Sequence, residues 1–162
     1  MKLTMEPFCE EDLPQITRIW NDVVEQGDSF PGDQVLTLDE AREMFAAQTE
    51  TVCVKLDGEV VGVYILHPNH IGRCSHVANA SYGVKQGCRG AGIGRAMVLD
   101  SLHRAGRHGF RGLQFNAVVR TNAAAIHLYE QLGFTRVGVI PGGYRLKDGS
   151  YMDILIFYHP TV

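Results

Sequence analysis

The feature that most constrains the fold is a glycine-rich turn between a strand-like and a helix-like segment. It contains four glycines: Gly87, Gly90, Gly92 and Gly94. Residues 76–84 before it have strand character, and residues 93–107 after it carry apolar side chains at helical spacing. Glycine lets a backbone approach a ligand closely, and the unpaired amides at a helix start favour an anion. The turn therefore predicts a phosphate or pyrophosphate site with Arg89 and Arg95 as counter-charges, the alternative being glycines that serve packing alone.

Two common phosphate-binding motifs do not fit this turn. A P-loop requires GxxxxGK[ST], and the chain contains no Gly-Lys pair. A dinucleotide-binding turn requires GxGxxG and an acidic residue about 20 positions later, which binds the ribose. The glycines here lie two apart, and no Asp or Glu occurs between Asp100 and Glu130. Both of these classes of nucleotide site are therefore excluded.

The rest of the chain has the pattern of an α/β protein. Thr37 and Glu40 have the spacing of a capping box that opens a helix, and Asp57-Gly58 is a strong hairpin signal. Strands are expected at residues 2–8, 51–56, 59–66, 76–84, 113–119, 135–140 and 151–158. Helices are expected at residues 10–26, 38–48, 93–107 and 123–132. The order β-α-α-β-β-β-α-β-α-β-β predicts a single domain over residues 1–162, with a mixed sheet of about seven strands and helices on both faces.

The composition is that of a globular protein. Of the 162 residues, 45% are hydrophobic and 20% are charged, and no stretch is long and apolar enough to span a bilayer. The N-terminus has no apolar run that could serve as a secretory signal. Cys9, Cys53, Cys74 and Cys88 lack zinc-type spacing, so we expect reduced thiols in a cytoplasmic protein without a structural metal.

Basic residues gather in one part of an acidic chain. The net charge is −3, yet residues 85–129 hold seven Lys or Arg and a single acid, Asp100. A local basic segment indicates an anionic ligand more than a nucleic acid, which would need a broader basic face. No stretch interleaves basic and aromatic residues, so an RNA-binding function has little support.

Two motifs resemble those of the GNAT superfamily of N-acetyltransferases. Arg89-x-x-Gly92-x-Gly94, at a strand-to-helix turn, is similar to the acyl-CoA-binding motif of that family. Residues 122–134, NAAAIHLYEQLGF, are similar to its N-x-x-A-x-x-x-Y-x-x-x-G-F signature. The motifs occur in the family's order, and the expected element order is also the family's. The resemblance therefore covers nearly the whole chain and implies a GNAT-like fold.

The resemblance implies acetyl-CoA as the co-substrate. It assigns cofactor binding to Tyr82, Val84, Arg89, Gly90, Gly92, Gly94, Arg95 and Asn122. In the family, a backbone amide of the strand before the turn, here residues 82–84, points at the thioester oxygen. Asn122 corresponds to a helix cap that contacts the pantetheine arm. Tyr129 corresponds to the tyrosine that protonates the departing thiolate; its alternative is a core aromatic.

The acceptor side depends on different residues. Asn79 and Asn116 lie on expected strands, where a side-chain amide is unfavourable unless it bonds something. Small-molecule acetyltransferases of the family, including those acting on proline analogues, have asparagines at these places. The resemblance thus implies catalytic contacts to the acceptor or the oxyanion, and the alternative is an amide that bonds the backbone. No carboxylate occurs between Glu59 and Asp100, which excludes a strand glutamate as base and leaves His76 or ordered water.

Taken together, the residues and the resemblance predict an N-acetyltransferase that moves the acetyl group of acetyl-CoA directly to the amine of a small molecule or amino acid. Trp20 and Phe30 either wall the acceptor pocket or belong to the core. The alternatives are a protein or peptide N-acetyltransferase and a non-catalytic acyl-CoA sensor with the same fold, which the presence of Tyr129 disfavours. The expected partner is the small amine, with no nucleic acid and no membrane. The resemblance also implies a homodimer through the final strands.

Overall fold

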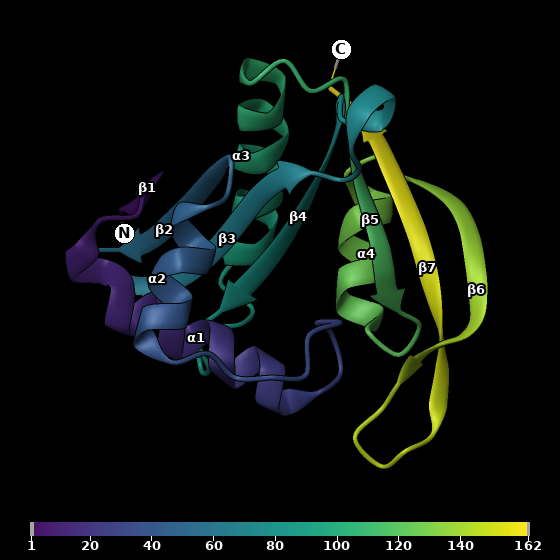
Figure 1. The fold of residues 1–162 in the computed structure, drawn as a ribbon, viewed down its shortest axis with the longest axis horizontal. Helices are drawn as coiled ribbons and strands as arrows, with labels where there is room; N and C mark the ends of the chain where they lie inside the picture. The colour runs from purple at the N-terminus through teal and green to yellow at the C-terminus, as the bar shows by residue number, and fades with distance from the viewer. Residues whose placement is uncertain (1, 162) are drawn as a thin grey trace.

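One mixed sheet of seven strands organises the chain (Figure 1). The computed structural model describes residues 2–161. The strands are β1 (Leu3–Pro7), β2 (Glu50–Leu56), β3 (Glu59–Pro68), β4 (Val77–Val84), β5 (Gly112–Val119), β6 (Thr135–Arg145) and β7 (Tyr151–Pro160). Their order across the sheet is β1-β2-β3-β4-β5-β7-β6. Neighbouring strands are antiparallel except β4 and β5, which run parallel.

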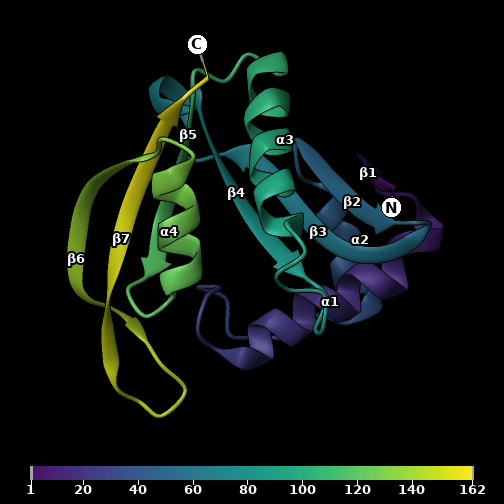
Figure 2. The same cartoon turned by 180° about the vertical axis from the view of Figure 1, so that it is seen from behind.

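Helices cover both faces of this sheet. They are α1 (Leu13–Gln26), α2 (Leu38–Ala46), α3 (Ile93–Arg107) and α4 (Ala123–Gln131), with 3-10 turns at Glu10–Asp12 and Gly72–Cys74. Helices α1 and α2 lie on one face, and α3 and α4 lie on the other, as the two opposite views show (Figures 1 and 2). The expected α/β class, element order and two-sided arrangement are therefore confirmed.

Local sequence chemistry explains most element boundaries. The Thr37 hydroxyl accepts from the Glu40 amide at 3.2 Å, and the Glu40 carboxylate accepts from the Thr37 amide at 2.9 Å, which completes the capping box. Asp57 has φ 51°, the left-handed conformation of a tight hairpin turn. The largest boundary difference is in β6, which continues past Ile140 to Arg145, because a bulge absorbs the Pro-Gly-Gly of residues 141–143 instead of ending the strand.

The parallel pair β4–β5 separates soon after it begins. Register partners are Val77 with Gly112 and Ala78 with Leu113, and no further pair forms between these strands within residues 2–161. On its other edge, β4 pairs with β3 from Ala78 to Val84. The edge of β4 that faces β5 is therefore open beyond Ala78, and this opening is where the site lies.

Strand alternation fixes which side chains of β4 face each helical layer. A Cβ placed on Gly83 would lie 3.3 Å from Ile19 of α1, so Asn79, Ser81 and Gly83 face the α1 side. The alternate residue Tyr82 instead reaches the core beneath α3, where its hydroxyl lies 2.7 Å from that of Ser101. The open strand therefore presents polar groups on one face and core side chains on the other.

Candidate functional site

A cavity of about 810 Å³ occupies the opening between β4 and β5. Every residue that the sequence assigned to catalysis or cofactor binding lines it: Asn79, Tyr82, Val84, Arg89, Gly90, Gly92, Gly94, Arg95, Asn116, Asn122 and Tyr129. These residues come from β4, the glycine turn, α3, β5 and α4. The fold thus brings the two sequence motifs to one place, although they are separated by helix α3 and strand β5.

The turn uses its glycines for two different reasons. Gly90 and Gly92 have φ of 86° and 77°, and no atom lies within 4 Å of a Cβ built on either, so conformation rather than packing requires glycine there. Gly94 has no such φ, and a Cβ on it would make only an ordinary contact of 3.8 Å with Leu128. Neither strain nor packing therefore explains Gly94. Its missing side chain leaves room on the cavity wall.

The start of α3 offers donors to an anion. The amides of the first helical turn have no intrahelical acceptor, and Gly92, which precedes the helix, supplies no side-chain cap for them. Arg89 and Arg95 are exposed beside them, and neither forms an ion pair with any residue of 2–161. Within residues 2–161, the Arg89 side chain donates only to the uncharged side-chain oxygen Oε1 of Gln26, at 3.1 Å. This end of the cavity fits a pyrophosphate group.

The half-buried Tyr82 side chain packs against the core and also lines the cavity. Ser101 donates its single hydroxyl proton to the Val98 carbonyl at 2.7 Å, so the Tyr82 hydroxyl donates to Ser101. Its ring packs at 5.6 Å from Tyr64 and 5.7 Å from Phe115. The Tyr82 hydroxyl is therefore engaged within the protein, whereas its residue still lines the cavity.

Tyr129 combines a packed ring with an available hydroxyl. The ring lies 4.5 Å from Phe115 and 5.6 Å from Phe134, centroid to centroid. The hydroxyl makes no hydrogen bond to any of residues 2–161. Its oxygen is not fully buried, so it does not count as a buried polar atom without a partner. Burial raises the pKa of Tyr129, so the phenol keeps its proton well into the alkaline range. The arrangement can hold a proton at the cavity wall.

Asn122 lies where the sequence predicted a helix cap. Its side-chain oxygen accepts from the Ala125 amide at 3.3 Å, at the start of α4. The cap role is confirmed by this geometry. The side chain is half-buried and lines the cavity, and its amide nitrogen is not used by the cap.

The two asparagines belong to one chain of amides. Asn79 donates from Nδ2 to the main-chain carbonyl of Gln114 at 2.9 Å, which matches the alternative of an amide bonded to backbone. Asn116 accepts at Oδ1 from Gln114 Nε2 at 2.9 Å and donates from Nδ2 to Asn69 Oδ1 at 2.6 Å. Asn79 is half-buried and Asn116 is exposed. Both line the cavity, and each retains hydrogen-bonding capacity beyond these bonds.

His76 does not reach the site. It is exposed just before β4, at the end of that strand where β4 and β5 are still paired, and it lines neither of the two cavities described here. Its main-chain carbonyl accepts from the Arg111 amide at 2.7 Å. The sequence left His76 and ordered water as candidate proton acceptors. His76 is not placed to act, so ordered water is the candidate that stays open.

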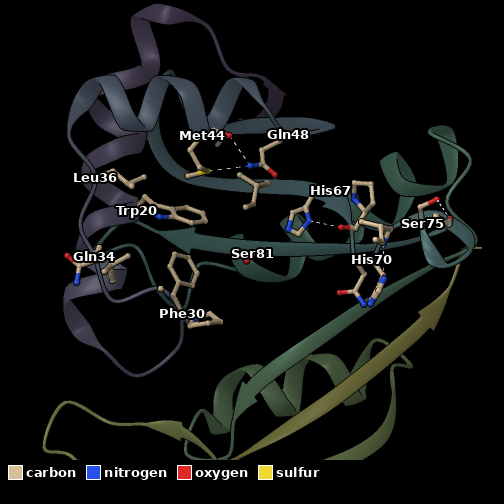
Figure 3. A pocket seen from close by; sticks show the side chains of 18 residues that line it. Trp20, Phe30, Gln34, Leu36, Met44, Gln48, His67, His70, Ser75 and Ser81 are labelled. Carbon is tan, nitrogen blue, oxygen red and sulfur yellow. Dashed lines mark hydrogen bonds between the residues drawn. The ribbon is translucent and has the colours of Figure 1, made fainter.

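A second cavity, of about 840 Å³, lies on the α1 and α2 side of β3 and β4 (Figure 3). It shares three lining residues with the first cavity: Phe30, Pro31 and Ser81. Phe30 is 8% exposed, and its ring lies 4.5 Å from that of Trp20, which also lines the second cavity. Both aromatic residues therefore wall this cavity, and both also contact the core.

The second cavity is apolar with a rim of uncharged polar groups. No Asp, Glu, Lys or Arg of residues 2–161 lines it. Its titratable groups are His67 and His70, which flank the end of β3. His67 Nδ1 lies 2.9 Å from the Pro68 carbonyl, so a neutral ring donates there and leaves Nε2 free as an acceptor.

Several residues of the site had no usable signal in the sequence. Asp28, the one carboxylate among the residues lining either cavity, lies in the loop after α1, where no sequence pattern indicated a site. Ser81 is ordinary in a strand, and Gln114 acts partly through its main chain. The pair His67 and His70 was visible as two histidines near a proline, but nothing placed them beside a cavity.

Residues 13–134 match a family model described as Acetyltransferase (GNAT) family. N-acetyltransferase aca1 of Schizosaccharomyces pombe is 34% identical over 169 residues, which is 93% of this chain and 81% of that protein. Phosphinothricin N-acetyltransferase of Alcaligenes faecalis is 24% identical over 162 residues, covering 97% of this chain and 82% of the relative. A phosphinothricin acetyltransferase from Sinorhizobium meliloti, solved in complex with acetyl-CoA, superposes with a TM-score of 0.89 at 22% identity, covering 99% and 89% of the two chains.

Among residues 2–161, no group of three or more His, Cys, Asp or Glu side chains is placed to hold a metal ion. Within the same range, every helix is too short or too polar to cross a membrane.

Proposed function

Because this chain belongs to the GNAT family of acetyltransferases, and is therefore an acetyl-CoA-dependent N-acetyltransferase, we propose that it acetylates the amine of a small molecule or amino acid. One observation carries the proposal. The cavity at the glycine turn and the second cavity meet at Phe30, Pro31 and Ser81. A co-substrate in the first cavity and an amine in the second would meet at this shared wall.

The first cavity is the proposed acetyl-CoA site. The pyrophosphate is held by the first-turn amides of α3, with Arg89 and Arg95 beside it. The pantetheine arm enters the opening between β4 and β5, where backbone groups on the β5-facing edge of β4 beyond Ala78 have no strand partner and can bond an amide-containing chain. Asn122 contacts this arm from the start of α4.

The proposed reaction is one direct transfer. The amine nitrogen attacks the thioester carbonyl carbon, and an amide of β4 near Tyr82–Val84 stabilises the oxyanion of the tetrahedral intermediate. The carbon–sulfur bond then breaks, and Tyr129 donates its proton to the departing sulfur. The proton lost by the amine leaves through ordered water in the cavity. Asn79 and Asn116 contact the acceptor or the intermediate from β4 and β5.

The second cavity favours a small acceptor. A volume of about 840 Å³ is in the range of small-molecule pockets, and the Trp20–Phe30 pair gives it an apolar wall. A relative named phosphinothricin N-acetyltransferase, whose name specifies a small amine, aligns over 97% of this chain. A cytoplasmic location is part of the same proposal, because Cys9, Cys53, Cys74 and Cys88 are all free thiols.

An acetylation screen tests the proposal. Purified protein and acetyl-CoA are mixed with a panel of small amines and amino acids, and in parallel with lysine-containing and free-N-terminus peptides. Thiol release measures turnover, and the mass of the product identifies the acetylated amine. The proposal expects saturable turnover with at least one small amine. Turnover confined to peptides would replace it with a protein or peptide acetyltransferase.

A further inference from the structure

Four side chains connect the two cavities through amide hydrogen bonds. Asn79 on β4 bonds the Gln114 carbonyl on β5, and Gln114 Nε2 donates to Asn116 Oδ1 at 2.9 Å. Asn116 Nδ2 then donates to Asn69 Oδ1 at 2.6 Å. Asn116 lines the cavity at the glycine turn, whereas Asn69 lines the second cavity. We call Gln114, Asn116 and Asn69 the amide relay.

The amide relay holds the exposed side chain of Asn116 at both its oxygen and its nitrogen. An exposed asparagine otherwise rotates freely and can present either its oxygen or its nitrogen. Here Gln114 occupies the Asn116 oxygen, and Asn69 takes one of the two Nδ2 hydrogens. The second Nδ2 hydrogen stays available. Asn69 is itself held, because its main-chain amide donates to the Val77 carbonyl at 2.8 Å and fixes the loop after β3 against the start of β4.

We propose that Asn69 and Gln114 are positioning residues that fix Asn116 as a hydrogen-bond donor to an oxygen of the bound acceptor or of the tetrahedral intermediate. The inference rests on the proposed function, since it assigns an acceptor-side task to Asn116. It adds that neither Asn69 nor Gln114 needs to touch the substrate. Preorganisation of this kind matters because a donor that must reorient during the reaction stabilises the transition state less.

Gln114 donates to Asn116 and Asn116 donates to Asn69, so the same amide-to-carboxylate change has opposite effects at the two outer residues. Asn69→Asp and Gln114→Glu each add one negative charge beside Asn116. A carboxylate only accepts hydrogen bonds, so Asn69→Asp keeps the acceptor that Asn116 Nδ2 needs, whereas Gln114→Glu removes the donor that Asn116 Oδ1 needs. Asn69→Ala removes the same acceptor without adding charge.

The kinetic test compares kcat/KM for the amine and the Kd of acetyl-CoA among these variants. Asn69→Ala and Gln114→Glu are expected to lower kcat/KM about tenfold, as the loss of one aligned hydrogen bond would. Asn69→Asp is expected to recover most of that loss, and the Kd of acetyl-CoA should stay unchanged in all three. Unchanged kinetics in Asn69→Ala would overturn the proposal, as would an equal loss in Asn69→Asp and Gln114→Glu.

A second readout separates this inference from the proposed function. The side-chain amide NMR signals of Asn116, identified by their loss in Asn116→Ala, report its hydrogen bonds without any turnover. They should shift strongly in Asn69→Ala and Gln114→Glu, and much less in Asn69→Asp. If the signals do not move in Asn69→Ala, the relay is wrong even when amines are acetylated. If they move as expected but no small amine is acetylated, the proposed acceptor class has failed, and with it the task assigned to the relay.

Discussion

Asn79 donates its side-chain amide to the main-chain carbonyl of Gln114 over 2.9 Å, at the first position where β4 and β5 are no longer paired. The last register pair is Ala78 with Leu113, the residues immediately before them. The side chain thus satisfies a carbonyl that a regular parallel ladder would have paired with backbone. Asn79 therefore lies at the point where β4 and β5 begin to separate, and it also lines the cavity.

Because Asn79 both bonds β5 and lines the cavity, Asn79→Ala is expected to lower stability as well as activity. Loss of the bond leaves the half-buried Gln114 carbonyl without its partner, which costs about 1 kcal/mol and lowers the melting temperature by a few degrees. The amine kcat/KM should also fall, by about a hundredfold if Asn79 stabilises the transition state directly. Thermal melting and steady-state kinetics on the same sample measure the two effects.

Asn79→Asp is the control, because an ionised carboxylate has the shape of the amide but cannot donate to Gln114. It should lose stability at neutral pH as Asn79→Ala does. A variant that loses stability but keeps the amine kcat/KM would show that Asn79 only bonds the Gln114 carbonyl and has no role in the reaction.

Tyr129→Phe removes a hydroxyl and leaves the packed ring. Since that hydroxyl has no hydrogen-bond partner among residues 2–161, the melting temperature should not fall. Turnover should decrease about 10- to 1000-fold, the usual contribution of a general acid, and the Kd of acetyl-CoA should change little. Intact turnover in the variant would mean that the thiolate leaves without help and that Tyr129 only packs against Phe115.

Arg89→Glu places a negative charge beside the proposed pyrophosphate site. The affinity for acetyl-CoA should drop about tenfold at low salt, and the loss should shrink as salt is added, because Arg89 is exposed and screened. Arg111→Glu makes the same charge change at the far end of β4 and β5 and should leave the affinity unaltered. Equal effects of the two substitutions would assign the change to net charge.

Tyr144→Phe tests the wall between the two cavities. The Tyr144 hydroxyl, from β6, donates to the Phe30 carbonyl at 2.6 Å in a buried position. Without this bond the loop after α1 is held less firmly, so the KM of the amine should rise while the Kd of acetyl-CoA changes less. Tyr151→Phe, an exposed tyrosine at the start of β7, is the matched control. A shift confined to the Kd of acetyl-CoA would place Phe30 on the cofactor side only.

The local parts of the site were predictable from the sequence. Gly92 and Asn122 owe their positions to backbone conformation and helix capping, which depend on neighbouring residues. Helix α3 begins and ends at Ile93 and Arg107 as expected, because its apolar spacing is regular and glycines precede it. The pairing of motifs across residues 85–134 followed from the family resemblance rather than from spacing.

The relationships between distant segments were not predictable in this way. The bond from Asn79 to Gln114 depends on how far two strands diverge, and a single sequence does not encode that angle in any local pattern. The second cavity takes its walls from helices α1 and α2, strands β3 and β4, and the loops after α1 and β3. Tyr82 was assigned to the cofactor through the backbone of its strand, on the family resemblance, and only the structure shows that its hydroxyl bonds Ser101 and its side chain packs against the core.

Calorimetric titration of acetyl-CoA into Gly94→Ala tests whether acetyl-CoA binds at the glycine turn. The added methyl meets only Leu128 at 3.8 Å, so the fold should be unchanged or slightly more stable, as alanine is preferred to glycine in helices by up to about 1 kcal/mol. The same substitution at Gly106, in the last turn of α3, is the control. The account predicts at least about tenfold weaker binding in Gly94→Ala alone, with no loss of melting temperature. Wild-type affinity in Gly94→Ala would contradict it.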